Sequence, residues 1–515
     1  MSPRKIIRSI ANVFRPRASY DAGKTGRRLG RWLPGNIGPN AAMWQDADTL
    51  RDRSRDSVRN NAWVKKGVTN WVSNEIGIGI TPRSLSLDDG FRGAADALWK
   101  EWVKVADADG VHDFYGLLSM SCRTRIEGGE IFWRRRPRRA DDGLVVPLQY
   151  QLLEPEFCPI QNDPVNNIRS GIRFSPIGAR QSYRMYREHP GDFFTNFGAD
   201  IVDVPASSII HHYAPLRPGQ LRGAPWTIQA LIKAKDFDEY DDAELVRKKT
   251  RSAYTGAVTR QQYDDNDYKF DPISGAPIDR NDVPPVIDIT AGTWVSLLPG
   301  EDVKPFEGDS TGQGYADFVR QALLGLAAGM DVPYEFLTGD YSKVNDRLVR
   351  VILNEYHRLL EQFQWLITIP QICNPVWKDF ITTAIAAGAL SAPGYAKDPS
   401  RYLAVEWRPY RWDYVHPLQD VQADAMRVDK GFASRSQVCS ERGESAEDID
   451  RQQSEDRARE TELGISYDDA SPADGGPADP AQAQVLDLGS DFIFGKPGRE
   501  YRTRAVKVKD YRSAA

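Results

Sequence analysis

The sequence predicts an α+β protein in which long amphipathic helices accompany an antiparallel sheet. The clearest helical signal begins at Asn345, after which apolar side chains recur every three or four residues, at Leu348, Ile352, Tyr356, Leu359, Phe363 and Leu366. Between residues 113 and 215, short apolar and aromatic runs alternate with turn residues, which is typical of antiparallel strands. The composition, 41% hydrophobic and 27% charged over 515 residues, is that of a globular protein long enough for about three domains.

The N-terminal part of the chain combines a basic arm with helices. Residues 1 to about 40 predict a flexible arm, because Met1–Arg31 contain nine Lys or Arg residues and one acid. A helix is expected over residues 42–75, and the segment Gly77–Pro82 ends it. The next helical pattern spans residues 87–105.

The strands of the predicted sheet follow one another along the chain. Ile131–Trp133 and Leu148–Leu152 predict two strands joined by a polar tip at residues 134–146. Further strands are expected at Ile172–Phe174, Tyr183–Tyr186 and Ile209–Tyr213. Their short spacing favours an antiparallel sheet within an α+β domain.

Two helices flank a region rich in Pro, Gly and Asp at residues 252–312. The first begins after Thr227, which can cap it, and runs to about residue 250. It is densely charged, and its thin apolar stripe consists of Ile228, Leu231, Phe237, Tyr240 and Val246. A thin stripe on a long helix indicates packing against a neighbouring helix, either of this subunit or of another. The second helix covers about residues 314–328, with Phe318 and Leu323 among its apolar residues.

The C-terminal third is expected to be helical and then disordered. Pro370 should end the helix that begins at Asn345. Helical patterns return at Trp377–Ala387 and at about residues 417–431. From Glu441 to Asp479, thirteen acids and four bases predict a disordered tail.

Charge and cysteine content exclude several classes of protein. The chain has 67 Lys and Arg against 72 Asp and Glu, a net charge of −5, which argues against a protein that coats nucleic acid. The four cysteines lie far apart in the sequence, which fits a reducing compartment and argues against a zinc ribbon or a disulfide scaffold. No apolar run approaches the roughly 20 residues needed to cross a bilayer, and no signal peptide is expected.

Two short matches to catalytic motifs lack the structural context that the chemistry needs. Ala18–Thr25 matches a relaxed phosphate-binding loop, but no buried strand precedes it. Gly308–Gly312 matches a nucleophile elbow with Ser310 at its centre, but the charged lead-in Glu301–Glu307 contains a proline. His357, a possible partner, lies in the middle of an amphipathic helix, where a surface role is favoured. A serine hydrolase that uses Ser310 is therefore kept only as an alternative.

No metal, cofactor or catalytic site is predicted. His211 and His212 are adjacent in a strand, so their side chains point to opposite faces and cannot easily share a metal. The run Asp264–Asp267 lacks the glycine and the distal glutamate of a calcium loop and is interpreted as a solvated loop. The cluster Arg134–Arg139 can meet phosphate or form a solvated hairpin tip, and the sequence leaves both readings open.

Several segments, taken in order, carry a resemblance to a known family. They are Arg51–Asn61, Gly77–Pro82, Glu127–Phe132, Glu188–Pro190, Arg217–Trp226, Tyr240–Leu245, Leu298–Glu301, Ala327–Asp340, Val405–Trp407 and Gly431–Arg435. Together they resemble the lambda-type portal proteins of tailed bacteriophages over about residues 40–465. After Asp340–Ser342, the family usually shows Asn followed by Tyr-Ser, whereas this chain reads Asn345-Asp346-Arg347.

The resemblance implies a structural role rather than an enzymatic one. It implies a ring of about twelve subunits at one capsid vertex, with a channel for packaging and ejection of double-stranded DNA. The implied partners are the terminase large subunit, the major capsid and scaffold proteins and the head-completion proteins, with no membrane. The implied location is the virion, and the host cytoplasm during assembly. A monomeric nucleic-acid-binding adaptor remains a second alternative.

The resemblance also implies a portal-type subunit with an antiparallel wing sheet, long stem and wing helices and a helical crown. The expected divisions are a basic arm (1–40), the N-terminal wing (41–226), a stem helix (227–251), a clip region (252–312), a second stem helix (313–330), the channel loop and long wing helix (331–370), the crown (371–465) and a flexible tail (466–515).

Three sets of residues are expected to mediate this function. Phe237, Tyr240, Phe318 and Leu323 should form stem contacts between subunits, and Asp264, Asp265 and Asp267 should face the terminase from the clip. The loop before the long helix should project into the channel near DNA; it comprises Gly339, Asp340, Tyr341, Ser342, Lys343, Val344 and Asn345. Lys343 supplies its single positive charge, repeated around the ring as a weak phosphate contact.

Overall fold

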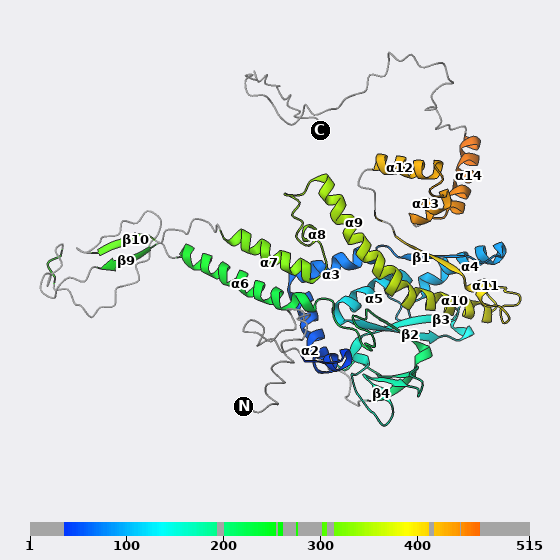
Figure 1. Cartoon of the computed structure of the whole chain (residues 1–515), viewed down its shortest axis with the longest axis horizontal. Helices are drawn as coiled ribbons and strands as arrows, with labels where there is room; N and C mark the ends of the chain where they lie inside the picture. Colours follow the sequence, from blue (N-terminus) through cyan, green and yellow to red (C-terminus); the bar gives the residue numbers. More distant parts are fainter. Residues whose placement is uncertain are drawn as a thin grey trace, which may run out of the picture. The chain divides into compact units, whose positions relative to one another are not determined.

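A computed structural model describes most of the central part of the chain (Figure 1). The described residues are 35–192, 200–253, 256–260, 274–276, 301–305, 314–410, 412, 417–442 and 444–463. The predicted arm therefore lies almost wholly outside them, as do Asp264, Asp265, Asp267, Ser310 and the end of the predicted tail. The chain divides into two units at Ala446, and each is described by itself.

The first helical stretch is confirmed, with one interruption. Helix α2 spans Pro39–Asn60 and α3 spans Ala62–Glu75. Asn61, which lies between them, has an extended backbone, and its side chain accepts hydrogen bonds of 3.0 Å from the backbone N–H groups of Trp63 and Val64. Asn61 therefore ends one helix and caps the next.

The next segments form a small sheet and two further helices. Strand β1 (Ile80–Ser84) pairs in antiparallel register with β11 (Val405–Pro409). Helix α4 (Asp89–Trp102) continues as the 3₁₀ turn η2 (Val103–Val105), which confirms the helix predicted over residues 87–105.

Helix α5 (Phe114–Gly128) was not predicted. Its N-terminus is capped by Asp113, whose side chain accepts a 2.7 Å hydrogen bond from the N–H of Gly116, and Gly129 follows its end with a φ of 89°. The apolar residues Leu117, Leu118, Cys122 and Ile126 are buried, at helical spacing. The cap, the spacing and the glycine were the signals of this helix in the sequence.

The antiparallel strands are confirmed, but they form two sheets. The first has the order β3-β2-β8, from Leu148–Leu153, Glu130–Pro137 and Ile209–Tyr213. The second has the order β4-β5-β6-β7, from Ile168–Arg169, Ile172–Phe174, Arg180–Tyr186 and Ile201–Pro205. Phe132, Tyr183, Met185 and Ile209 belong to one small core between these sheets.

The main core lies on the opposite face of the first sheet. It is rich in aromatic rings from α3, α4, α5 and α10 (Asn374–Ala386). The ring of Trp99 lies 5.2 Å from Phe114, 5.4 Å from Trp377 and 5.1 Å from Phe380, centroid to centroid. Such edge-to-face and tilted packing gives the helices and the sheet a common core.

Two long helices run side by side next to this body (Figure 1). Helix α6 spans Ile228–Ala253 and α7 spans Tyr315–Gly329, which confirms both predicted helices. Beyond α6, strand β9 (Gly256–Arg260) pairs in antiparallel register with β10 (Glu301–Pro305).

The long helix that begins at Asn345 is confirmed at its start but not at its end. After α8 (Tyr334–Thr338), helix α9 spans Asp346–Phe363, and Asn345 accepts a 2.9 Å hydrogen bond from the N–H of Leu348. The expectation that Pro370 ends this helix is wrong. A π-helical segment, Gln364–Cys373, carries the chain past Pro370 into α10, and the Asn374 N–H donates to the Ile369 carbonyl, five residues back. Proline has no N–H to donate, and in an α-helix its ring clashes with the carbonyl four residues back; the wider π winding relieves that clash.

The C-terminal helices are α11 (Ser400–Leu403), α12 (Pro417–Asp429), α13 (Arg435–Glu441) and α14 (Ala446–Leu463). The disordered tail predicted from Glu441 is wrong over α14. That helix buries only Ala446 and carries pairs three residues apart, Arg451 with Asp448 and Arg459 with Asp456. Composition alone misses a polar helix of this kind. No helix within the described ranges has the length and hydropathy of a membrane span.

Candidate functional site: the α6–α7 helix pair and the loop before α9

Helices α6 and α7 pack against each other in antiparallel fashion. At the start of α6, Gly329 lies so close to Ala230 that an added Cβ would come 3.2 Å from the Ala230 backbone. Further along, the rings of Tyr240 and Phe318 lie 4.2 Å apart. The small residues at one end and the aromatic pair at the other therefore define one continuous contact.

Only one narrow stripe of α6 is buried. Ala230, Ala234 and Phe237 are buried along it. Phe237 is 7% exposed and Leu323 on α7 is 4% exposed, so both are already covered within this chain. Tyr240 is 37% exposed and Phe318 is 45% exposed, although they pack on each other. Of the four predicted stem residues, these two offer apolar surface to a neighbour.

Polar contacts join the C-terminal half of α6 to the start of α7. The Tyr315 hydroxyl donates a hydrogen bond to the Asp241 carboxylate, and the Lys248 ammonium lies 4.5 Å from the Tyr315 ring centroid. The hydrogen bond to Asp241, together with burial, raises the pKa of Tyr315 to about 12. Ile232, Leu245 and Val246 of α6 remain exposed. An apolar surface of this kind on a charged helix suits a protein partner.

The base of α6 is fixed by a buried cluster of charged groups, the Glu130 cluster. The Glu130 carboxylate accepts hydrogen bonds from Arg51 at 2.6 Å and from Arg222 at 2.7 Å. It also accepts from the Nε2 of His211 at 2.8 Å and from the backbone N–H of Gly223 at 2.9 Å. The cluster thus joins α2, β2, β8 and the segment that leads into α6. Near it, the hydroxyls of Ser54 and Thr227 lie 2.6 Å apart, at the start of α6.

The electrostatics of the Glu130 cluster keep its carboxylate charged. Burial alone would raise the pKa of Glu130, but the guanidiniums of Arg222 and Arg51 and the hydrogen bond from His211 lower it well below its usual value. Burial lowers the pKa of His211 to about 4. His211 is therefore a neutral imidazole that donates to Glu130 through Nε2 and faces Arg180 through Nδ1 at 3.2 Å.

A second buried cluster fixes the far end of α9. Glu75 at the end of α3 pairs with Arg125 of α5. Its carboxylate also accepts a 2.8 Å hydrogen bond from the Thr368 hydroxyl of the π segment. The Gln364 amide donates to the Glu75 carbonyl at 2.6 Å. These contacts set the direction of α9 and so the place of the loop at its other end.

The loop Gly339–Asn345 is a polar turn ordered by its own side chains. Gly339 has a φ of 74°, which favours glycine, and ends α8. The Asp340 carboxylate accepts hydrogen bonds from the backbone N–H of Ser342 at 3.1 Å and from its hydroxyl at 2.6 Å. These bonds, and the nearby charges of Arg320 and Lys343, lower the pKa of Asp340. Tyr341, Ser342 and Lys343 are exposed, and Val344 is half-buried.

Arg320 of α7 is a further basic group near this loop that the sequence analysis missed. Its guanidinium carbon lies 5.6 Å from the Tyr334 ring centroid. The positive charge of Arg320 helps to lower the pKa of Asp340. Arg320 precedes Lys343 by twenty-three positions, and no local pattern links them.

His211, His212 and His357 each make a separate structural contact. His211 and His212 point to opposite faces, as predicted: His211 contacts Glu130, whereas the Nδ1 of His212 lies 2.9 Å from the Ser121 hydroxyl. His357 is half-buried rather than at the surface, because its ring stacks on Trp412 at 3.6 Å. Burial lowers the pKa of His357 to about 4.

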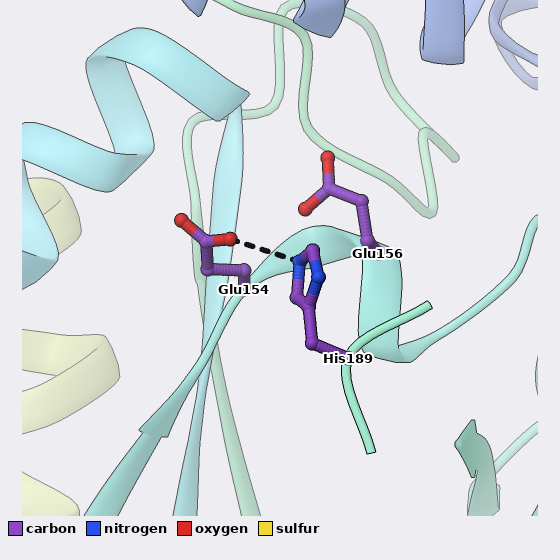
Figure 2. A group of neighbouring side chains, drawn as sticks. All are labelled: Glu154, Glu156 and His189. Atoms are coloured by element: carbon purple, nitrogen blue, oxygen red, sulfur yellow. Dashed lines mark ion pairs between the residues drawn. The ribbon is translucent and has the colours of Figure 1, made fainter. Parts of the chain in front are cut away.

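One group of potential metal ligands lies together within the described residues (Figure 2). His189 lies 3.0 Å from the Glu154 carboxylate, and Glu156 lies beside them. Arg55 of α2 reaches the same carboxylates, at 2.9 Å from Glu156 and 3.3 Å from Glu154. The Arg55 guanidinium thus already pairs with both acids, and the group fastens α2 to the sheet region.

One protein-family model and several known proteins match most of this chain. A family model described as phage portal protein, lambda family, matches residues 25–364. The chain is 27% identical over 440 residues to a probable portal protein of Halomonas phage phiHAP-1, covering 82% of each chain. It is 22% identical over 484 residues to the portal protein of Escherichia phage N15, covering 86% of this chain and 90% of that one.

Two more distant similarities complete the comparison. The portal protein B of Escherichia phage lambda is 21% identical over 480 residues, covering 85% of this chain and 89% of its own. Among solved structures, a chain from the neck of an empty gene transfer agent particle aligns with a TM-score of 0.45 at 15% identity, covering 82% of this chain and 99% of that chain.

Proposed function

The chain belongs to the lambda family of phage portal proteins, and from this premise we propose that its copies form a closed ring of about twelve at one vertex of the capsid. The ring serves as a conduit for double-stranded DNA during packaging and ejection. The protein acts in the virion, after assembly in the host cytoplasm. We assign it a structural rather than a catalytic role.

The observation that carries this proposal is the surface of α6. A helix of 26 residues packs against α7, α2 and α3 and leaves Ile232, Leu245 and Val246 exposed. Apolar side chains on a charged helix are stabilised when a second copy covers them. We assign α6 and α7 as the stem, and Tyr240 and Phe318 as its contacts between subunits. Phe237 and Leu323 support the stem from within the subunit.

The rest of the proposed layout follows from the chain order. The sheets and the helices α2 to α5 form the wing, with α9 as its long helix, and the helices after residue 371 form the crown. The region between the stem helices, which begins with β9 and ends with β10, forms the clip. Asp264, Asp265 and Asp267 lie in it, and we propose that they face the terminase large subunit.

The loop Gly339–Asn345 is proposed as the part that lies near DNA. Lys343 is exposed, and the hydrogen bonds of Asp340 to Ser342 hold the turn in shape. A few positive charges per subunit, repeated around a ring, guide a duplex without holding it, because each phosphate contact adds only a modest counterion-release term. The wing and crown are proposed to meet the major capsid and scaffold proteins, and the clip to meet the head-completion proteins.

Mass measurement and negative-stain electron microscopy of the purified chain test the proposal. We expect rings with a central channel and a mass of about twelve subunits. A chain that stays monomeric at micromolar concentration and binds DNA would contradict the proposal and favour an adaptor. A hydrolytic activity lost in Ser310→Ala would contradict the non-catalytic role.

A further inference from the structure

The inner faces of the two sheets end in arginines. On β2, Phe132 lies in the core between the sheets, and Arg134 and Arg136 follow on the same face at two-residue steps. On β6, Met185 lies in the same core, and Arg187 follows two residues later, directly beyond the strand. The apolar core thus opens into a rim of three arginines, here named the arginine mouth.

Arg134 lies close enough to Arg136 and to Arg187 to be repelled by both. Burial, together with the charges of Arg136 and Arg187, lowers the pKa of Arg134. Arg136 is half-buried, and its Nε is shielded from solvent without a hydrogen-bond partner. The neighbouring Arg135 points to the other face, where it pairs with Asp379. The mouth is therefore distinct from the structural arginine beside it.

Counter-charge is scarce in the mouth. Throughout the described part of the chain, no hydrogen bond or ion pair engages the side chain of Arg134 or of Arg136. Arg187 pairs with Asp200 at 3.1 Å, but these side chains are 64% and 78% exposed, so the pair contributes little. A polar atom shielded from water without a hydrogen-bond partner, such as the Arg136 Nε, is costly, and a chain of net charge −5 has acids enough to pair these arginines. Their isolation points to a partner outside the chain.

The spacing of these cations suits a rigid row of anions. Alternate residues of a strand lie about 6.6 Å apart, so Arg134 and Arg136 present two guanidinium forks in a fixed register. A guanidinium binds a phosphate with two parallel hydrogen bonds. Duplex DNA offers a dense row of permanently charged phosphates, whereas an acidic peptide must be ordered before it can present its carboxylates in a row.

We propose that Arg134, Arg136 and Arg187 form a second nucleic-acid contact, separate from the loop before α9, that binds the phosphate backbone of double-stranded DNA without reading its sequence. The choice of DNA as the polyanion rests on the proposed function. The contact lies on the sheets rather than on the α6–α7 pair. It can therefore bind DNA that lies outside the part of the channel formed by the stem helices.

Binding of a fluorescent 20-base-pair duplex to the full chain, measured by anisotropy over a range of salt concentrations, tests the proposal. The Arg134→Gln/Arg136→Gln variant should bind about tenfold more weakly at low salt, and the slope of log affinity against log salt should fall by about 2, because two phosphate contacts are lost. Lys65→Gln/Lys66→Gln removes the same charge from exposed positions of α3 and should leave the slope unchanged. Equal slopes in the two variants would overturn the proposal.

A site-specific measurement separates this contact from other basic segments. Phenylglyoxal modifies accessible guanidiniums, and peptide mass spectrometry reports each arginine. DNA should protect Arg134 and Arg136 in the wild-type chain. Protection by polyglutamate that equals or exceeds protection by DNA would overturn the assignment in favour of an acidic protein, and absence of protection by DNA would overturn it outright.

The outcome is separable from that of the proposed function. Rings that form normally in the Arg134→Gln/Arg136→Gln variant, with unchanged DNA binding, would remove the arginine mouth and leave the portal assignment intact. A wild-type chain that forms no ring would contradict the proposed function, whatever the salt slope. Circular dichroism of the variant, with Arg134→Lys/Arg136→Lys as the charge-preserving form, shows whether the fold is retained; the lysine form should recover most of the salt slope.

Discussion

The backbone of Gly223 lies directly against that of Gly129, so closely that a Cβ on Gly223 would come 2.6 Å from the Gly129 carbonyl carbon. Gly129 precedes β2, and Gly223 lies just before α6. The N–H of Gly223 donates to Glu130 at 2.9 Å, in the cluster that also binds Arg222 and Arg51. The start of the proposed stem helix is therefore fixed on the sheet by backbone contact and by a buried charge.

Gly223→Ala should destabilise the chain by about 3 kcal/mol, because the methyl group meets backbone that cannot move aside. Gly93→Ala is the matched control: nothing lies within 4 Å of a Cβ at Gly93, inside α4, so this change should stabilise by about 0.5–1 kcal/mol. Denaturant unfolding measures both. Equal stability of Gly223→Ala and wild type would show that the two segments separate freely.

Glu130→Gln should lower the free energy of unfolding by about 3–5 kcal/mol, because it leaves buried guanidiniums without their counter-charge. The folded-state pKa of Glu130 is lowered, so its stabilisation is complete above its unfolded pKa of about 4.3 and is lost as the pH falls through the folded value. The unfolding free energy of the wild type should therefore drop more steeply below about pH 5 than that of the variant. Parallel pH profiles would refute this, and Glu101→Gln, at an exposed pair, is the control.

Tyr240→Asp with Phe318→Asp should weaken ring assembly more than it weakens subunit folding, because both side chains are substantially exposed. Phe237→Asp should instead unfold the subunit, because Phe237 is buried within it. Light-scattering mass and circular dichroism separate the two effects. Full-size rings from the first variant would remove Tyr240 and Phe318 from the subunit interface.

Lys343→Glu should leave ring assembly unchanged and alter packaging or retention of DNA, because Lys343 is an exposed base of the loop before α9. Lys397→Glu, at another exposed position, makes the same change of charge as a control. Full-length genomes packaged and retained at the normal rate by Lys343→Glu particles would end the channel assignment of this loop.

Deletion of Asp264–Asp267 should leave rings intact and reduce binding of the packaging motor. Loops between rigid elements are suitable docking surfaces, and the loss of three acids weakens contact with a basic partner. A pull-down of the terminase large subunit by wild-type and deleted rings measures the effect. Unchanged capture would exclude this segment from the interface.

Local patterns in the sequence were sufficient to predict those helices and strands whose bounds depend on their own residues. The start of α9 was predictable because Asn345 caps it and the apolar spacing follows directly. The strands Ile172–Phe174 and Ile209–Tyr213 were predicted with their observed bounds, because turn residues delimit them. The family resemblance likewise rests on short segments in order, and the family match confirms it.

Tertiary structure decided what residues far apart in the chain do together. Glu130 meets its partners across 79, 81 and 92 residues, so no periodicity could show that Arg51, His211 and Arg222 share one carboxylate. The same applies to the helix past Pro370, which continues because π winding accommodates the proline while Ile369 and Ile372 stay buried in the core. Spacing reports which face a residue occupies, whereas the partner on that face is set by the folding of the whole chain.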